Sequence, residues 1–241
     1  MKKAFLLTVT FLSGLVSGMA QTPNTLTAQE RREGWKLLFN GKDTAGWHTY
    51  GKQGIGSAWR IEDGALKLDV PVRAGNKAKN GGDIVTDAAF KGDFEFKADW
   101  KVSRLANSGI FFFVTEAPAY KEPYHTGLEL QVLDNAIYEG APENKHRAGD
   151  FFSVSNARIR EPSPVGEWNQ VHFILKGRTL SVYMNGYLIQ EHNLDSADWK
   201  QRIAASNLKA APISTGQLAG RIGLQDWGST VWYRNIKFRQ L

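Results

Sequence analysis

The sequence contains no cysteine among its 241 residues. This absence excludes a disulfide framework, a thiolate nucleophile, a thiolate metal site and a lipid-modified cysteine after an export signal. The fold must therefore depend on its hydrophobic core. A chain of this length can bury enough apolar surface for that without covalent crosslinks.

The sequence also lacks an apolar run of the ~20 residues that a membrane-spanning helix needs. The apolar run at residues 4–16 is shorter, and no later stretch approaches that length. It follows Lys2 and Lys3 and precedes Gly18 and Ala20. A positive start, a short apolar segment and small residues at a cleavage site are typical of a secretory signal peptide.

We therefore expect cleavage before Gln21, which removes residues 1–20. Residues 21–241 are then expected to form a single domain, since β-sandwiches of ~200–250 residues commonly fold as one unit. The mature protein is expected to be periplasmic or secreted, with no membrane span.

Clustered charge is missing as well. The net charge is +6, and without the two lysines of the expected signal peptide it is +4. Basic and acidic residues are interspersed, and no five like charges follow one another. A nucleic-acid-binding domain would gather its cations on one face or in one run, so we expect no nucleic-acid partner.

Strand patterns dominate the rest of the chain. Residues 93–102 alternate between apolar and charged side chains, which predicts an antiparallel strand with one buried and one wet face. Residues 110–114 are apolar on both faces and predict a central strand. The pairs Asp63-Gly64 and Asn185-Gly186 are typical of two-residue hairpin turns. The same periodicity predicts a core that contains Phe94, Phe96, Trp100, Ile110, Phe112, Leu130, Val132, Ile222 and Leu224.

Helix patterns are few. A capping box begins a short helix near Thr27, and residues 195–204 predict a second one. Residues 70–83 and 135–149 are rich in turn formers and predict long surface loops. The fold class is therefore all-β, an antiparallel two-sheet sandwich of the jelly-roll type, with a closed barrel as the alternative.

The common catalytic motifs are absent. The sequence has no nucleophile elbow, phosphate loop or dinucleotide fingerprint. Its five histidines are scattered, and no two of them have the spacing of zinc ligands. His125 could still meet Glu129 in space, and His146 could approach from its loop.

Polar residues beside predicted core strands are the best candidates for a site. Glu129 and Gln131 share the face of their strand opposite the apolar one, and Asn107 directly precedes a strand. Gln225 stands close to Trp227. Amides and carboxylates bind sugar hydroxyls, and an aromatic ring stacks on the apolar face of a sugar. Each of these residues could instead have a purely structural role, on the solvent-exposed face of a strand or in a turn.

Nine segments, taken in order, resemble one family, the bacterial 3-keto-disaccharide hydrolase domain. They are residues 34–43, 46–47, 59–66, 107–110, 129–134, 166–169, 185–186, 224–226 and 234–237. No segment is specific alone, but the ordered set spans nearly all of the mature chain. The resemblance implies a concanavalin A-like jelly roll, in agreement with the strand pattern.

The resemblance also implies a substrate, a 3-keto-glycoside whose ketone a separate sugar oxidase supplies. Such a ketone acidifies the C2 proton, so that a base can remove it, the C1 substituent can leave by elimination and water can add to the enone. Glu129 is the candidate base, and Asp134 or His125 the candidate acid. His146, Arg147 or a divalent metal ion could hold the enolate. The candidate substrate-binding residues are Asn107, Gln131, Gln225, Asp226 and Trp227.

Two positions depart from the family pattern. Trp227 stands where relatives often have histidine, and residues 150–152 read Asp-Phe-Phe where relatives commonly have a small residue and tyrosine. These departures would alter specificity or activity if relatives use those positions in catalysis. One competing interpretation is a carbohydrate-binding lectin, because the same amides and tryptophans can bind sugar without reacting. A third possibility is a structural or surface-interaction protein.

Overall fold

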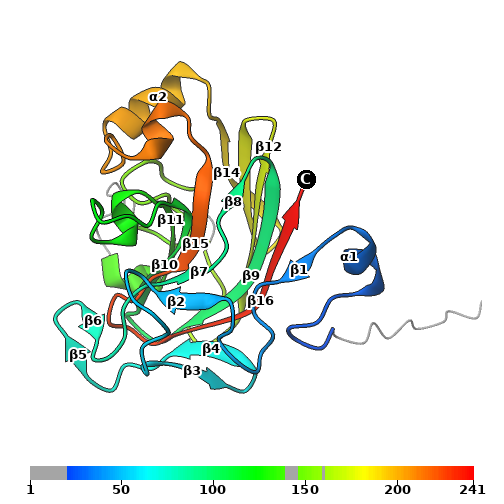
Figure 1. Ribbon diagram of the computed structural model, residues 1–241, viewed down its shortest axis with the longest axis vertical. Helices are drawn as coiled ribbons and strands as arrows, with labels where there is room; N and C mark the ends of the chain where they lie inside the picture. The colour runs from blue at the N-terminus through cyan, green and yellow to red at the C-terminus, as the bar shows by residue number, and fades with distance from the viewer. Residues whose placement is uncertain (1–20, 139–145, 159–160) are drawn as a thin grey trace, which may run out of the picture.

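The computed structural model describes residues 21–138, 146–158 and 161–241 (Figure 1). The expected signal peptide lies outside the described residues, and so does part of the predicted loop at 135–149. Two large antiparallel sheets pack face to face, which confirms the all-β sandwich. Within the described ranges, no helix is both long and apolar enough to cross a membrane.

The larger sheet has eight strands, and the last strand of the chain lies in its interior, between β9 and β4. From edge to edge the strands are β14 (Tyr187–Asn193), β13 (Thr179–Met184), β12 (Asn169–Lys176), β9 (Phe94–Val102), β16 (Val231–Gln240), β4 (Ala65–Leu68) and β3 (Trp59–Glu62), and β1 (Lys36–Leu37) pairs with the far end of β16.

The smaller sheet has six strands, and it carries the polar strand singled out in the sequence. Its order is β11 (Leu128–Leu133), β10 (Asn107–Val114), β15 (Ala219–Leu224), β7 (Ile84–Thr86) and β2 (Trp47–Thr49), with β8 (Phe90–Lys91) paired to one end of β15. The prediction of a plain loop at residues 70–83 was wrong, because β5 (Arg73–Ala74) and β6 (Lys77–Ala78) form a small hairpin there.

Both predicted helices are present. Helix α1 (Ala28–Arg32) begins with the capping box of Thr27 and Glu30, and α2 (Ala197–Ala204) buries Trp199 and Ile203 on one side. Three short 3₁₀ segments complete the described elements: η1 (Pro123–His125), η2 (Asn135–Tyr138) and η3 (Pro212–Thr215).

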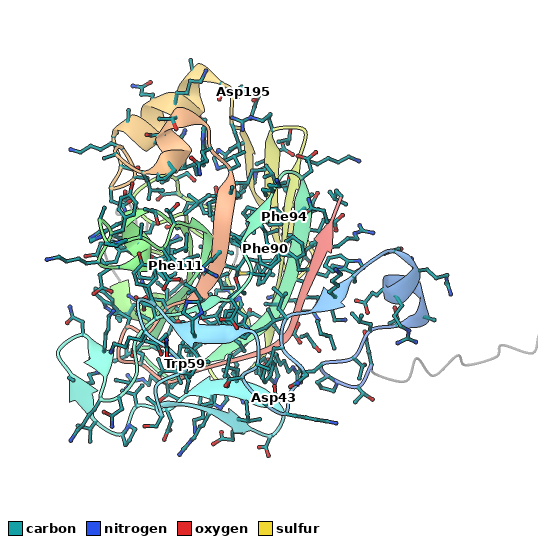
Figure 2. The ribbon with its side chains drawn as sticks, viewed as in Figure 1. Asp43, Trp59, Phe90, Phe94, Phe111 and Asp195 are labelled. Carbon is teal, nitrogen blue, oxygen red and sulfur yellow. The ribbon has the colours of Figure 1, made fainter. Side chains whose placement is uncertain are left out.

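Local sequence explains how the strands are joined and where the core lies. Asp63, Gly64, Asn185 and Gly186 all have positive φ, as the predicted two-residue hairpin turns require. All nine residues predicted for the core are buried. Phe94 lies between the sheets (Figure 2), where it stacks on rings that include Phe173 at 5.4 Å between centroids.

The outer face of β9 is not wet, as its alternating pattern had predicted. Glu95 and Asp99 are only 8% and 6% exposed. The rings of Trp35, Trp168 and Trp232 lie beside the cationic side chains on this face, as between Lys97 and Trp35 at 4.4 Å. The alternation predicts which face of the strand packs against the apolar core, but it does not predict which residues cover the other face.

Candidate active site

A cavity of about 270 Å³ lies on the smaller sheet, on the side away from the core. The strand β11 sends Leu128, Leu130 and Val132 into the core, so Glu129 and Gln131 face outward. The lining residues are Asn107, Tyr124, Glu129, Gln131, His146, Phe152, Gln225 and Trp227. Six of these eight were candidate site residues from the sequence alone.

Strand pairing brings residues distant in the chain to this cavity. Gly109 of β10 stands opposite Gln131 of β11, and its carbonyl oxygen accepts a hydrogen bond from the backbone N–H of Gln225 at 2.9 Å. Gln131 and Gln225 therefore flank the same point of the central strand from its two sides.

The carboxylate of Glu129 lies between these two amides. Its Oε1 accepts hydrogen bonds from Nε2 of Gln131 at 2.7 Å and from Nε2 of Gln225 at 2.9 Å. The side chain is 4% exposed. Oε2 has no hydrogen-bond partner among the described residues, so the carboxylate keeps one oxygen for a ligand.

Burial raises the pKa of Glu129 to about 8, and the negative charge of Asp83 adds to the rise. The two amide hydrogen bonds lower the pKa but do not compensate. No cation contacts this carboxylate in the part of the chain that the structure describes. A carboxyl group with a pKa near neutrality can take up and return a proton, as a general base or acid must.

Gly109 makes room for this carboxylate. A Cβ atom at position 109 would lie 2.6 Å from Oε1 of Glu129 and 2.8 Å from its Cγ. The residues beside Gly109 have separate roles. Asn107 lines the cavity, whereas Ser108 points into the core and donates a hydrogen bond to the carbonyl oxygen of Gln225 at 2.7 Å. The Asn-Ser-Gly segment is thus part of the site and more than a turn.

The two glutamines also present unused acceptors. Oε1 of Gln131 and Oε1 of Gln225 are buried and have no partner in the described structure. A buried polar atom without a partner costs about 1–3 kcal/mol. A ligand whose hydroxyl groups donate to these oxygens would recover that cost.

The segment after residue 145 forms one wall of the cavity. The backbone N–H of Phe152 donates to the carbonyl oxygen of Glu129 at 3.0 Å, so this segment lies along the edge of β11. His146 and Phe152 thereby reach the cavity. Burial lowers the pKa of His146, with Asp150 opposing the change, so the imidazole is neutral at pH 7.

Four predicted site residues do not line the cavity: Asp134, His125, Asp226 and Arg147. Asp134 caps a turn, with its carboxylate accepting from the backbone N–H groups of Leu105 and Ala136 at 2.8 and 3.1 Å. It follows the strand on the face of Val132, away from Glu129. His125 packs its ring against Tyr124 at 4.6 Å, and it is Tyr124 that faces the cavity.

Asp226 is fully buried, and its contacts are structural. Its carboxylate accepts hydrogen bonds from the backbone N–H groups of Ala78, Gly82 and Gly228 at 2.7–3.0 Å. It thus ties the β5–β6 hairpin to the end of β15. Trp227, the next residue, is the one that lines the cavity.

Three residues at this site were not among the candidates from the sequence: Tyr124, Phe152 as a wall and Asp83 as a charged neighbour of Glu129. Tyr124 lies in a 3₁₀ turn that has no periodic pattern. Asp83 lies at the end of what was interpreted as a loop, and it reaches the site through the pairing of β7 with β15. The departure from the family pattern at residues 150–152 was the only signal for Phe152.

A metal ion does not fit the described donors. Within the described ranges, no three His, Asp or Glu side chains are grouped as a metal site would require. His146 shares the cavity with one carboxylate, Glu129, and the other described lining side chains are amides and aromatic rings. The described lining of this cavity is therefore not a metal site.

Comparison with known proteins agrees with this architecture. A 3-keto-disaccharide hydrolase of Bacteroides thetaiotaomicron is 31% identical over 230 residues, which cover 87% of this chain and 79% of that protein. The crystal structure of a candidate glycosyl hydrolase of Parabacteroides distasonis has a TM-score of 0.78 at 30% identity, covering 91% of this chain and 100% of that one.

A Bacillus subtilis protein with a galectin-like fold is similar in fold alone, with a TM-score of 0.51 at 17% identity over 80% of this chain and 89% of that one. Residues 34–239 match the family described as the 3-keto-alpha-glucoside-1,2-lyase-like domain. This match spans most of the sequence and includes every described residue that lines the cavity. The chain therefore belongs to the 3-keto-alpha-glucoside-1,2-lyase-like domain family.

Proposed function

We propose that this protein cleaves the glycosidic bond of 3-keto-glycosides by removing the C2 proton, eliminating the C1 substituent and hydrating the product. One observation carries the proposal. Among the described residues that line the cavity, Glu129 is the one carboxylate, and it is buried between two amides with a pKa of about 8. The name of the Bacteroides thetaiotaomicron relative, a 3-keto-disaccharide hydrolase, supports the same substrate class.

A single carboxylate does not suit ordinary glycoside hydrolysis. Most glycosidases use two carboxyl groups, about 5–5.5 Å apart for retention or ~6.5–9.5 Å apart for inversion. Among the described lining residues of this cavity, Glu129 is the one carboxylate. Proton abstraction beside a ketone needs one base, because the substrate's own carbonyl group accepts the electrons.

The proposed reaction conserves all atoms. Glu129 takes the C2 proton, and the C–H electron pair forms an enolate with the C3 ketone. The enolate then reforms the ketone as a C1=C2 double bond forms and the C1–O bond breaks, and the leaving oxygen takes up a proton. Water adds its hydroxyl to C1 and a proton to C2, which gives the 3-keto sugar.

The cavity offers suitable groups for these steps. Protonated Glu129 is the donor at hand for the leaving oxygen, and its raised pKa allows it to hold that proton at neutral pH. The amide of Asn107 and the neutral imidazole of His146 are candidates to donate hydrogen bonds to the enolate oxygen. Phe152 and Trp227 supply apolar walls for a sugar ring.

We further propose that the protein acts in the periplasm or outside the cell, because its first 20 residues have the pattern of a secretory signal peptide. The ketone must come from another enzyme that oxidises the C3 hydroxyl group of the glycoside. A sugar oxidase acting before this protein would fill that role.

Incubation with a panel of 3-keto-glycosides and their unoxidised parents tests the proposal, with product release followed over time. We expect turnover of the keto substrates alone, because the C2 proton of a parent glycoside is not acidic. Equal turnover of both classes would overturn the elimination mechanism. Binding without turnover of either class would identify a lectin.

A further inference from the structure

A second cavity, of about 430 Å³, lies beside the β2 edge of the smaller sheet, next to the β5–β6 hairpin. Its polar lining residues include Thr49, Tyr50, Lys77, Asn80, Asp83 and Glu122. They come from β2, from the β5–β6 hairpin and the residues after it, and from the loop before η1. None of them was a candidate site residue from the sequence.

Two links show that this cavity adjoins the one around Glu129. Asp83 accepts a hydrogen bond from the backbone N–H of Asp226 at 2.8 Å, and Asp226 stands between Gln225 and Trp227 of the first cavity. The charge of Asp83 also contributes to the raised pKa of Glu129, which requires the two carboxyl groups to be near each other.

The loop before β11 provides a third link. Glu122 lines the second cavity and Tyr124, two residues later, lines the first. This loop therefore contributes to both cavities, and both border the smaller sheet. Ligand sites span about 300–1,000 Å³, and the first cavity lies just below this range while the second lies in its lower half, so neither alone suggests a site for a long chain.

The second cavity presents a charged pair. Nζ of Lys77 lies 2.5 Å from Oε2 of Glu122 and 3.2 Å from Oδ2 of Asp83. The carboxylate of Glu122 is 35% exposed and Lys77 is 32% exposed, so both can contact a ligand. An ammonium and a carboxylate side by side supply donors and acceptors for neighbouring hydroxyl groups, and the ring of Tyr50 adds an apolar surface.

We propose that the second cavity binds the leaving group of the reaction as a sugar ring, so that the substrate is a 3-keto-disaccharide or longer glycoside lying across both cavities. This inference rests on the proposed function, since it assigns the oxidised ring to the cavity of Glu129. The Lys77–Glu122 pair then holds the hydroxyl groups of the leaving sugar.

Glu122→Ala tests the assignment, because it removes an exposed carboxylate and leaves Lys77 bonded to Asp83. We expect kcat/KM for a 3-keto-disaccharide to fall about tenfold, the ~1.4 kcal/mol of one hydrogen bond to a charged group. A methyl 3-keto-glycoside lacks the second ring, so its kcat/KM should stay within about twofold of wild type. Glu167→Ala, an exposed glutamate outside both cavities, is the matched control and should change neither value.

A binding experiment separates failure of this inference from failure of the proposed function. In a Glu129→Gln background, the keto-disaccharide should bind tighter than the methyl keto-glycoside, and Glu122→Ala should reduce this difference about tenfold. If the difference is found but wild type turns over neither compound, the second site stands and the proposed reaction fails. If wild type turns over both and Glu122→Ala affects them equally or not at all, the second site is overturned.

Discussion

The two sheets each carry a buried glutamate on the side away from the core, and the two residues differ in their partners. Glu95 of the larger sheet receives hydrogen bonds from Arg239 and His172. Glu129 of the smaller sheet receives hydrogen bonds from two neutral amides. Their exposed fractions are similar, at 8% and 4%.

The partners decide how each glutamate titrates. Burial raises the pKa of both, but at Glu95 the hydrogen bonds and charge of Arg239 and His172 outweigh burial, and the pKa lies below its usual value. At Glu129 burial prevails and the pKa is about 8. A buried carboxylate beside a guanidinium stays ionised at neutral pH, whereas one bonded only to amides can exchange a proton near neutral pH.

The largest expected contrast is in activity. Glu129→Gln should lower kcat on 3-keto-glycosides by ~10²–10⁴, the usual contribution of a general acid–base group, because glutamine keeps the size but cannot take the proton. Glu95→Gln should leave kcat within about twofold. Steady-state rates of both purified variants test this. Full activity in Glu129→Gln would remove Glu129 as the base.

The same two variants should have opposite effects on stability. The folded-state pKa of Glu129 lies above its unfolded value, so its stability contribution falls as pH rises from about 4.5 to about 8. Glu129→Gln should therefore raise the free energy of unfolding by ~2–4 kcal/mol above pH 8, and by little near pH 4.

Glu95→Gln should instead lower the free energy of unfolding by ~1–3 kcal/mol at neutral pH, because it removes charge-assisted hydrogen bonds. The pKa of Glu95 is lowered, so this loss should disappear as pH falls through that lowered pKa. Urea unfolding at several pH values measures both effects. A Glu129→Gln variant that is less stable than wild type at pH 9 would contradict the comparison.

Gly109→Ala should have a smaller effect on stability. The new Cβ would lie 2.6 Å from Oε1 of Glu129, so the carboxylate must move and stability should fall by ~1–3 kcal/mol. Removing the obstructed side chain as well, in Gly109→Ala/Glu129→Ala, should make the combined loss less than additive. Additive losses would show that Gly109 does not act through Glu129.

The smallest expected effect is a shift in pH dependence. If Glu129 is the base, kcat/KM should increase with pH as Glu129 loses its proton, and the midpoint of this increase should lie near pH 8. The hydrogen bond from Gln131 lowers the pKa of Glu129, so Gln131→Ala should move this midpoint upward, by roughly one pH unit or less. Gln170→Ala, on the outer face of the larger sheet, is the control and should leave the midpoint unchanged.

Features set by neighbouring residues could be predicted from the sequence. Asp63-Gly64 and Asn185-Gly186 fix their own turns, and period-2 alternation places Glu129 and Gln131 on one face without knowledge of their neighbours. Gln225 could be proposed because its strand shows the same alternation. These signals were enough for the sandwich and for most of the lining of the cavity.

Features set by distant residues could not be predicted. The sequence suggests a sugar-binding carboxylate at Asp226, but this carboxylate already accepts hydrogen bonds from the backbone N–H groups of residues 78 and 82. Asp134 is turned away by the turn that it caps, and Asp83 reaches Glu129 through strand pairing. A carboxylate in a turn has many possible partners, and the sequence does not show which of them the fold supplies.

The position of β16 has a consequence for the order of folding. This strand, Val231–Gln240, lies between β9 and β4, and it is the last strand of the sequence. Until it is synthesised, β9 and β4 have unpaired edges and the larger sheet cannot close. Such non-local pairing folds slowly. A chain that is truncated before Val231 should therefore aggregate through the exposed edges of β9 and β4.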